Sequence, residues 1–527
     1  MQENKQKYQA FTGKSLCTIV PFGCIGIGQG GIPLRRTLPI FYNALLLTAV
    51  NLLLRFVSTS FQVHISGRIG AEGVGLLQLV MSVGGLAMTA GMAGVRTATM
   101  YVTAEELGKR KQENVPHVLS SCFIYSILCS SVVAIALYIC APFLSEHWIG
   151  NPQVIGAVRL FAVFLPVVCL SGCMTGYFTA ANRIGTLAVV EILEQLCYMV
   201  VTMLVLILWA KTNPEKCCQA VVLGSGISAC LTLLALVFLR LRERNKAGPP
   251  IPTASRLLQI AVPLALADDL KAGISTTENL MVPKRLALHN GVQAPLAAFG
   301  IVCGMVFPVL MFPSAILFAL AELLIPELAR CAAAGSRQRV RYLASRSLKV
   351  ALLYGCLCCG ILYLLSDTLC LSLYDSTEAG QFLRQYAMLA PMLYCDAIID
   401  AMNKGLGQQK ISVRYNILTS AMDVLFLYLL LPKYGMTGYF ISFFITHLVN
   451  FLLSLRLLLR TTGISVSFST PAFTAFATIA AIFGASFTGS TPSKPLSFAG
   501  IFGSVLVLLG VVTQSDFAWI RGMIKKR

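Results

Sequence analysis

Residues 118–142 read VLSSCFIYSILCSSVVAIALYICAP, an apolar run without a charged side chain. A helix needs about 20 such residues to cross a hydrocarbon core of ~30 Å, and runs of this kind recur along the chain. The 527 residues are 56% apolar and 12% charged, with a mean hydropathy of +0.76. A soluble domain carries about 25% charged residues. The composition therefore excludes a soluble multidomain enzyme and predicts a polytopic, all-α membrane protein.

Hydropathy predicts fourteen transmembrane helices. Their expected limits are residues 40–62, 74–102, 118–142, 154–181, 185–210, 218–240, 257–281, 296–325, 346–365, 385–403, 411–431, 436–458, 468–489 and 496–516.

The distribution of basic residues tests this count. With the N-terminus inside, 29 of the 41 Lys and Arg fall in cytoplasmic segments and 8 in outer loops, as the positive-inside rule requires. One helix more or fewer would reverse the side of every later loop. We therefore expect a multi-pass protein of the cell membrane with both termini in the cytoplasm. The net charge of +19 then faces anionic lipid, not nucleic acid.

Two features carry little functional weight. Cys356, Cys358 and Cys359 lie in an apolar run without His, which favours small buried hydrophobes over metal ligands or disulfides. Residues 1–39 are expected to be a disordered cytoplasmic arm. Their Gly26-x-Gly28-x-x-Gly31 lacks the strand and helix that a dinucleotide site needs.

The chain repeats itself internally. A shift of 225 residues lays the fourth and fifth spans over the tenth and eleventh, and a shift of 223 relates the second to the eighth. A unit of six helices enters the membrane from the same side in both copies, which gives parallel repeats. The predicted divisions are an N-lobe at 40–241, a cytoplasmic linker at 242–256, a C-lobe at 257–460, and two further helices with a basic tail at 461–527. Transporters with such repeats bind substrate at the repeat interface.

Cations inside the membrane are candidate anion ligands, because ionisable groups at that depth are costly and guanidinium matches phosphate oxygens. Arg55 is expected at mid-span with no acidic residue in its helix, and Arg96 lies in the second span. Arg96 could instead snorkel toward the cytoplasm. The predicted substrate-binding residues are Asn51, Arg55, Arg96 and Lys271.

Acidic residues in the spans are candidates for ion coupling or for charge pairing with the cations. They are Glu191, Glu194, Asp268, Asp269, Glu278, Asp396, Asp400 and Asp423. Asp268, Lys271 and Ser275 share a helix face, which suits either a cavity wall or a self-neutralising structural pair. Asp396, Asp400 and Asn403 suit a cavity wall or a solvated helix end.

Five prolines fall inside predicted spans, where freed backbone groups line cavities or permit bending. They are Pro166, Pro263, Pro308, Pro313 and Pro391. A kink that serves packing alone is equally consistent.

Several motifs resemble the multidrug/oligosaccharidyl-lipid/polysaccharide (MOP) exporter superfamily, and within it polysaccharide transporters of the stage V sporulation protein B type. One is Arg68-Ile69-Gly70-Ala71-Glu72-Gly73-Val74-Gly75-Leu76, and a second is Val282-Pro283-Lys284-Arg285-Leu286. The others are Phe299-Gly300-Ile301-x-x-Gly304-Met305-x-x-Pro308-x-x-x-Phe312-Pro313 and Leu324-Ile325-Pro326-Glu327. The resemblance covers about residues 40–515. It implies a MATE/flippase-like fold.

The resemblance also implies a role for two arginines. Related lipid II flippases line a cationic cavity with arginines of their first two helices, and Arg55 and Arg96 match those positions. A second arginine that follows the first in those flippases is replaced here by Phe61 and Gln62.

These inferences predict a flippase, not an enzyme, that moves an undecaprenyl-pyrophosphate-linked saccharide or peptidoglycan precursor by alternating access. Its product would serve the spore cortex or another envelope polysaccharide. We expect a monomer without cofactor or bound metal, driven by H+ or Na+ gradients or by the membrane potential. The alternatives are a multidrug/cation antiporter and an intramembrane glycan polymerase. The polymerase needs large outer loops, and the longest here is the modest 366–384 segment.

Overall fold

The computed structural model describes residues 38–109, 112–181, 183–210, 213–242, 254–464, 469–487 and 493–512. The chain divides into two compact units, Met1–Leu53 and Leu54–Arg527, and of the first only the helical stretch from residue 38 is described. The predicted arm at 1–39, most of the 242–256 linker and the basic tail after residue 512 lie outside the described residues.

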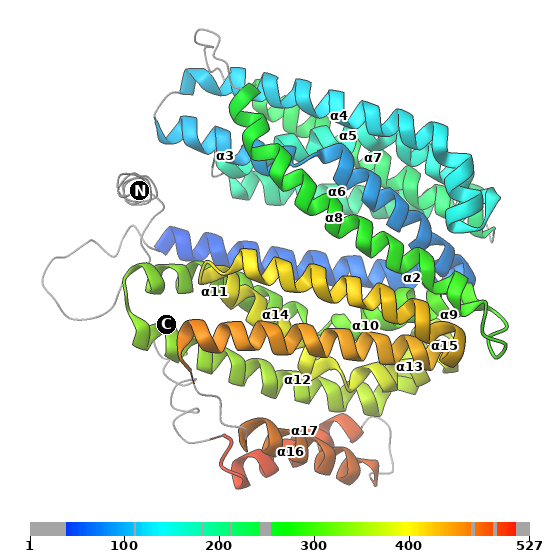
Figure 1. Ribbon diagram of the computed structural model, residues 1–527, viewed down its shortest axis with the longest axis vertical. Helices are drawn as coiled ribbons and strands as arrows, with labels where there is room; N and C mark the ends of the chain where they lie inside the picture. The colour runs from blue at the N-terminus through cyan, green and yellow to red at the C-terminus, as the bar shows by residue number, and fades with distance from the viewer. Residues whose placement is uncertain are drawn as a thin grey trace, which may run out of the picture. The chain divides into compact units, whose positions relative to one another are not determined.

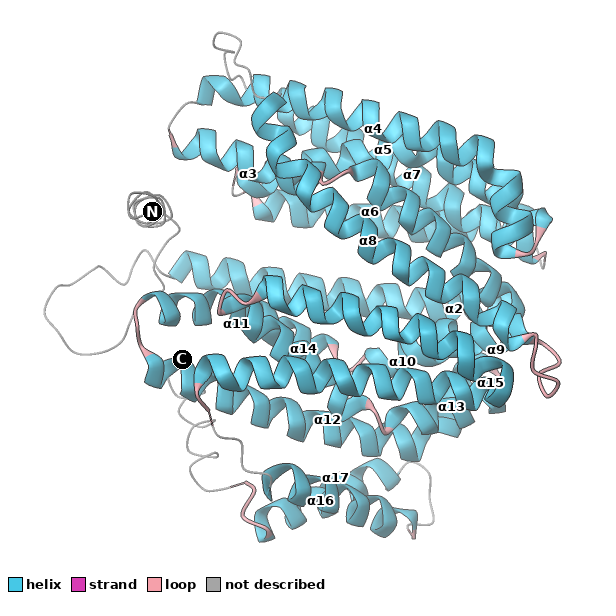
Figure 2. Cartoon of the chain, viewed as in Figure 1, coloured by secondary structure: helices cyan, strands magenta, loops and turns pink. Residues whose placement is uncertain are grey.

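The described residues form helices joined by short connections, and they include no strand (Figures 1 and 2). The first half contains α2 (Leu38–Met92), α3 (Val95–Gly108), α4 (Val115–Phe143), α5 (Ile155–Ala180), α6 (Ile184–Val205), α7 (Pro214–Leu241) and α8 (Ala254–Leu286). The second contains α9 (Pro295–Gly300), α10 (Phe307–Met311), α11 (Ala315–Ala333), α12 (Arg337–Tyr374), α13 (Thr377–Ala387), α14 (Ala390–Gly405), α15 (Gln409–Thr462), α16 (Ser469–Ser486) and α17 (Lys494–Leu508). Turns of π-helix extend α4 and α6 and join α9 to α10, at Leu144–Ile149, Leu206–Ala210 and Ile301–Val306.

Two of these helices are each a pair of consecutive helices. α2 has 55 residues and α15 has 54, which would extend ~80 Å at 1.5 Å per residue, more than twice the hydrocarbon core. Gly70 (φ 71°, ψ 172°) and Gly435 (φ 56°, ψ −135°) break them. A positive φ suits glycine, which has no Cβ. Each glycine stands between two spans that the sequence predicts separately.

The predicted all-helical membrane protein with fourteen helices is confirmed. Eight described helices are long and apolar enough to cross a membrane, or nine if Pro295–Met311 and Ala315–Ala333, bent by 64°, make one span. Dividing α2 and α15 at their glycines, joining α13 to α14, and adding α8 and the shorter α17 gives the remaining helices.

The prolines fall at different kinds of site. Pro166 and Pro263 lie inside the continuous helices α5 and α8. Pro308 follows the π-helical turn, and Pro313 lies in the 64° break before α11. Pro391 is in the first turn of α14, where a missing N–H costs nothing.

Helices that are close in sequence also pack together. α3 and α7 both contact α5, while α11, α12 and α15 all contact α14. α16 and α17 pair with each other and cover α12 (Figure 1), where Gly360 makes room for the Phe498 ring. α8 contacts both α3 and α15, so it links the earlier helices to the later ones.

A second link is a close backbone contact between α2 and the start of the α9–α10 segment. A methyl group on Gly300 would overlap the Ala71 carbonyl and lie 2.6 Å from the Gly75 nitrogen. A methyl on Gly75 would overlap the Leu296 carbonyl. We call Ala71, Gly75, Leu296 and Gly300 the glycine seam. Two backbones approach so closely only where one of the facing residues is glycine, as Gly75 and Gly300 are here.

Gly300→Ala should therefore destabilise the protein. The added methyl meets main-chain atoms that cannot rotate away, and overpacking of this kind costs ~1–3 kcal/mol. Gly500→Ala is the matched control, because nothing lies within 4 Å of a methyl at that position of α17. Thermal unfolding in detergent measures both. Equal melting temperatures for the two variants would show that the seam is not closely packed.

Candidate functional site

The second predicted span is broken where it meets α8. α2 ends at Met92 and α3 begins at Val95, and between them Ala93 (φ 43°) and Gly94 (φ 70°) adopt left-handed backbone. A Cβ on Gly94 would lie 2.6 Å from the Ala261 carbonyl oxygen and 3.3 Å from the Ala265 nitrogen. The missing side chain of Gly94 thus allows both the left-handed backbone of the turn and the close approach of α8.

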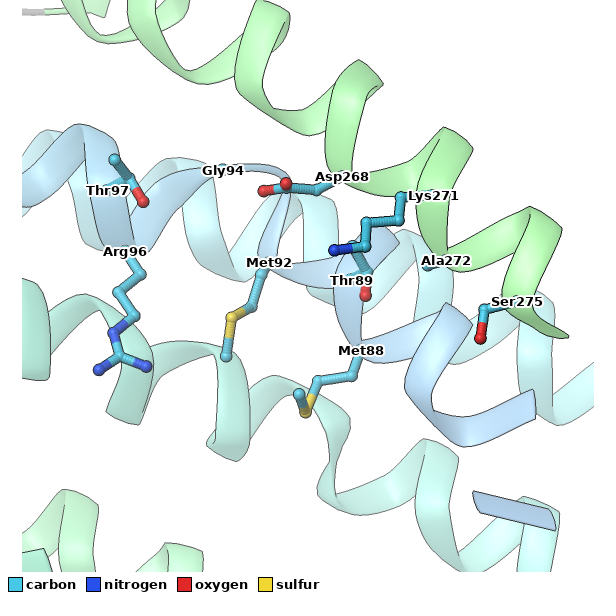
Figure 3. A pocket seen from close by; sticks show the side chains of 10 residues that line it. All are labelled: Met88, Thr89, Met92, Gly94, Arg96, Thr97, Asp268, Lys271, Ala272 and Ser275. Carbon is cyan, nitrogen blue, oxygen red and sulfur yellow. The ribbon is translucent and has the colours of Figure 1, made fainter. Parts of the chain in front are cut away.

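A cavity of about 460 Å³ opens beside this break (Figure 3). The α2–α3 segment supplies Met88, Thr89, Met92, Gly94, Arg96 and Thr97, and α8 supplies Asp268, Lys271, Ala272 and Ser275. We call it the α2–α8 cavity. Two cations, one carboxylate and three hydroxyls line it, together with two thioethers. The volume lies within the range of ~300–1,000 Å³ typical of small-ligand sites.

Arg96 reaches the cavity from α3. Its backbone passes so close to α5 that a methyl on Gly176 would overlap the Arg96 carbonyl, and this packing fixes its position. Its side chain is exposed and extends to the same side as Met88 and Met92 (Figure 3). Glu191 of α6 lies within electrostatic range of the guanidinium.

The α8 wall carries an exposed polar stripe. Asp268, Lys271 and Ser275 follow steps of three and four residues, and all are exposed. The ion pairs among the described residues do not include Asp268 with Lys271. Asp268 and Lys271 therefore do not form a self-neutralising structural pair in this structure. The neighbouring Asp269 does not line the cavity.

The structure does not bring Arg55 to this cavity. The Arg55 guanidinium lies over the Phe318 ring of α11 at 4.6 Å, and the next residue, Phe56, packs against Phe312 at 5.5 Å. Arg55 is exposed. Asn51 belongs to α2, but its side chain lies outside the described part of the structure.

Asp423 forms a second polar centre with the later half of α15. Its Oδ1 accepts hydrogen bonds from Ser442 (2.6 Å) and Thr446 (3.2 Å). Glu278 of α8 lies within electrostatic range of the same carboxylate. We call Glu278, Asp423, Ser442 and Thr446 the Asp423 cluster. Oxygen-only donor sets suit hard cations or a shared proton.

The acidic face of α14 packs against α15 as well. Asn450 donates to Asp396 at 3.1 Å, and Ser412 donates to Asp400 at 2.8 Å. Lys404 pairs with Asp400 at 2.6 Å. Asn403 is buried and donates to the Ser454 carbonyl at 3.1 Å. This face is thus an interhelical hydrogen-bonded surface.

The remaining acidic candidates are scattered. Glu194 of α6 interacts with Thr232 of α7, and Asp269 keeps one buried oxygen without a hydrogen bond. Among the described residues, no group of three His, Cys, Asp or Glu side chains has the geometry of a metal site. The described cysteines carry free thiols.

The sequence analysis did not identify Thr89, Thr97, Met88 and Met92 as cavity residues. Their signal is the Gly91-Met92-Ala93-Gly94 run inside an apolar span. Closely spaced glycines there could have indicated a break that exposes its flanking turns. Hydropathy alone predicts neither the break in the helix nor the side of the helix on which the cavity lies.

The sequence matches two family models. Residues 40–267 match a model described as polysaccharide biosynthesis protein, and residues 286–429 match MatE. Stage V sporulation protein B of Bacillus subtilis (strain 168) is 22% identical over 377 residues, which are 68% of this chain and 72% of that protein.

Solved structures share the fold. The lipid II flippase MurJ in an inward closed conformation aligns with a TM-score of 0.65 at 12% identity, over 90% of this chain and all of that one. An inward-facing multidrug resistance MATE family transporter of the MOP superfamily aligns with a TM-score of 0.62 at 12% identity, over 80% of this chain and all of that one. The chain therefore has the MATE/MurJ-like fold.

The pairing of Asp396 with Asn450 should be measurable by a double-mutant cycle. Asp396→Ala leaves the half-buried Asn450 amide without its acceptor, a change that typically costs ~1–3 kcal/mol. Asp396→Asn retains a carbonyl acceptor and should cost less. With Asn450→Ala added, the effect of Asp396→Ala should shrink by at least ~0.5 kcal/mol. Strict additivity of the unfolding free energies would contradict the contact.

Proposed function

We propose that the chain is a MOP-superfamily transporter of the polysaccharide biosynthesis/MATE-like kind, as its family matches and its fold support, and that it moves a phosphate-bearing, lipid-linked saccharide across the cell membrane. The proposed cargo is an undecaprenyl-pyrophosphate-linked saccharide or peptidoglycan precursor, for the spore cortex or another envelope polysaccharide. The observation that carries this proposal is the α2–α8 cavity with Arg96 and Lys271 in its walls.

The two cations suit a phosphate head group. A guanidinium binds phosphate oxygens through paired hydrogen bonds, and an ammonium adds a mobile point charge. The hydroxyls of Thr89, Thr97 and Ser275 can donate to saccharide or phosphate oxygens. The polyprenyl tail would remain in the surrounding lipid, because its transfer into a polar cavity loses the hydrophobic stabilisation. Arg55, exposed beside Phe318, would meet the head group at a separate stage of its path.

Two pseudo-equivalent lobes would alternate around this cavity. Ala93 and Gly94, shifted by 223 residues, fall at Ile316 and Leu317, within a few residues of the 64° break before α11. Equivalent breaks support the proposed N-lobe at 40–241 and C-lobe at 257–460. With cytoplasmic termini, the glycine seam would close the outer side while the cavity faces inward. Separation of the seam would then release the cargo outside.

The Asp423 cluster is our candidate for ion coupling. Its carboxylates and hydroxyls can hold Na+ or a proton, and moving one charge through the membrane potential yields about 2.3 kcal/mol per 100 mV. Asp400, already paired with Lys404, is less available. Glu191 and Glu194 could perform the same role near Arg96.

A multidrug/cation antiporter is the second candidate. The observation that favours it is the set of acidic residues Asp396, Asp400 and Asp423 on α14 and α15, which lie within the MatE match. Efflux of cationic dyes from cells that express the protein, without movement of lipid-linked saccharide, would select this candidate.

Arg96→Ala and Lys271→Ala should each slow transport of an undecaprenyl-pyrophosphate-linked saccharide about 10-fold or more, since a charge-assisted hydrogen bond contributes ~1.5–3 kcal/mol. Reconstituted vesicles with a fluorescent saccharide measure the rate. The controls are Arg159→Ala, an arginine stacked on Tyr138 outside the cavity lining, and Lys433→Ala beside the Gly435 break. Rates unchanged in both cavity variants would refute the proposed site.

Asp423→Asn should preserve the fold, because the amide oxygen still accepts from Ser442 or Thr446, but it should uncouple transport from the ion gradient. Transport is measured with and without an imposed Na+ or H+ gradient. We expect the stimulation to be lost in Asp423→Asn and kept in Asp375→Asn, a change at the C-cap of α12. Full stimulation in Asp423→Asn would remove the cluster from the coupling scheme.

A further inference from the structure

We propose that the α2–α8 cavity takes a zwitterionic head group, in which a positively charged amine lies close to the phosphate, and that Asp268 binds the amine. This inference deepens the proposed function and rests on it. It makes Asp268 a specificity-determining residue that separates amine-bearing lipid-linked saccharides from their N-acylated counterparts.

The position of Asp268 follows from the packing of α8 on the break. Ala261 and Ala265 contact Gly94 through their backbone atoms. Asp268 follows Ala265 by three residues and therefore continues the same helix face. In Figure 3 its carboxylate extends toward Gly94, at the rim of the cavity. A contact between backbones fixes this register, so the carboxylate is aimed by the fold.

A negative group and a positive group lie close together along the α8 wall. With a helix rise of 1.5 Å per residue, Asp268 and Lys271 are ~4.5 Å apart along the axis, and Ser275 lies ~6 Å beyond. Arg96 of α3 lines the same cavity. A head group that lies along this wall meets the Asp268 carboxylate and, next to it, the Lys271 ammonium.

The carboxylate is free to bind a ligand. Asp268 is exposed, and no described residue pairs with it within 4.0 Å. A purely anionic head group would be repelled by it at the point where Lys271 attracts it. A protonated amine removes that conflict, because it supplies the counter-charge that the carboxylate lacks.

The cavity volume also limits the size of the head group. About 460 Å³ suits a ligand of one or two sugar rings, since pockets of ~300–1,000 Å³ enclose drug-sized molecules. A long glycan chain would extend beyond the cavity. The inferred cargo is thus a short, amino-bearing saccharide phosphate on a lipid.

A matched pair of substrates tests the inference. Polyprenyl-phosphate-linked glucosamine and N-acetylglucosamine differ in one group, a charged amine or a neutral amide. In vesicles containing the full-length protein, we expect about 10-fold faster transport of the glucosamine lipid. Asp268→Asn should reduce this ratio to about one, because it slows the amine-bearing lipid and removes the repulsion of the N-acylated lipid, and Asp268→Glu, which keeps the charge, should restore part of it.

Asp269→Asn is the matched control. It removes the same charge one residue along α8, outside the cavity lining, and should leave the ratio of the two rates unchanged. Melting temperatures of all variants establish that they are folded. Equal rates for the two lipids in the unmodified protein would overturn the inference, as would an Asp268→Asn variant that slows both lipids alike.

Binding separates this inference from the proposed function. Glucosamine 1-phosphate should protect the detergent-solubilised protein against thermal unfolding at about 10-fold lower concentration than N-acetylglucosamine 1-phosphate, and Asp268→Asn should remove the difference. Such binding without transport of either lipid would refute the proposed function and leave the cavity assignment standing. Equal transport of both lipids, with equal protection, would refute the cavity assignment and leave the transport function standing.

Discussion

The close approach of two backbones at Gly94 is the contact on which the candidate site depends. A break in a membrane helix leaves amide and carbonyl groups without helical partners, and such groups are tolerated only against protein or water. Here the break packs on α8 at Ala261, within the described unit. The contact brings α8 beside the break and leaves the cavity next to it. Arg96 and the polar stripe of α8 line the same cavity because this contact holds the two segments at a fixed register.

The polar groups of the two halves have different surroundings. In the first half two candidate cations are exposed: Arg96 lines a cavity, and Arg55 lies over an aromatic ring. In the second half the carboxylates of α14 and of the first part of α15 accept hydrogen bonds from side chains of α15. Exposed cations can exchange water for a ligand, whereas bonded carboxylates organise helix packing and can take up a small ion. In the proposed function, this arrangement would separate cargo recognition from energy coupling.

The helical membrane fold follows from the sequence because crossing length and charge asymmetry depend on composition alone. The direction and rotation of each helix depend on its packing partners, and the sequence pattern does not specify those partners. Arg55 and Arg96 were predicted for one chamber, yet Arg55 stacks on Phe318 and only Arg96 reaches the cavity with Lys271. The α14 acids were given two alternatives, cavity wall or solvated end, and they bond α15 instead. No local pattern encodes a partner that lies fifty residues away.

The glycine seam also bears on how quickly such a molecule can change state. Contacts of interlocked side chains must unlock rotamer by rotamer, and each step adds to the activation barrier. Main chain resting on main chain, as at Gly75 and Gly300, has no torsions to reset before it parts. In the proposed alternating access, the two backbones can therefore separate and close again without a change of side-chain rotamers at this contact.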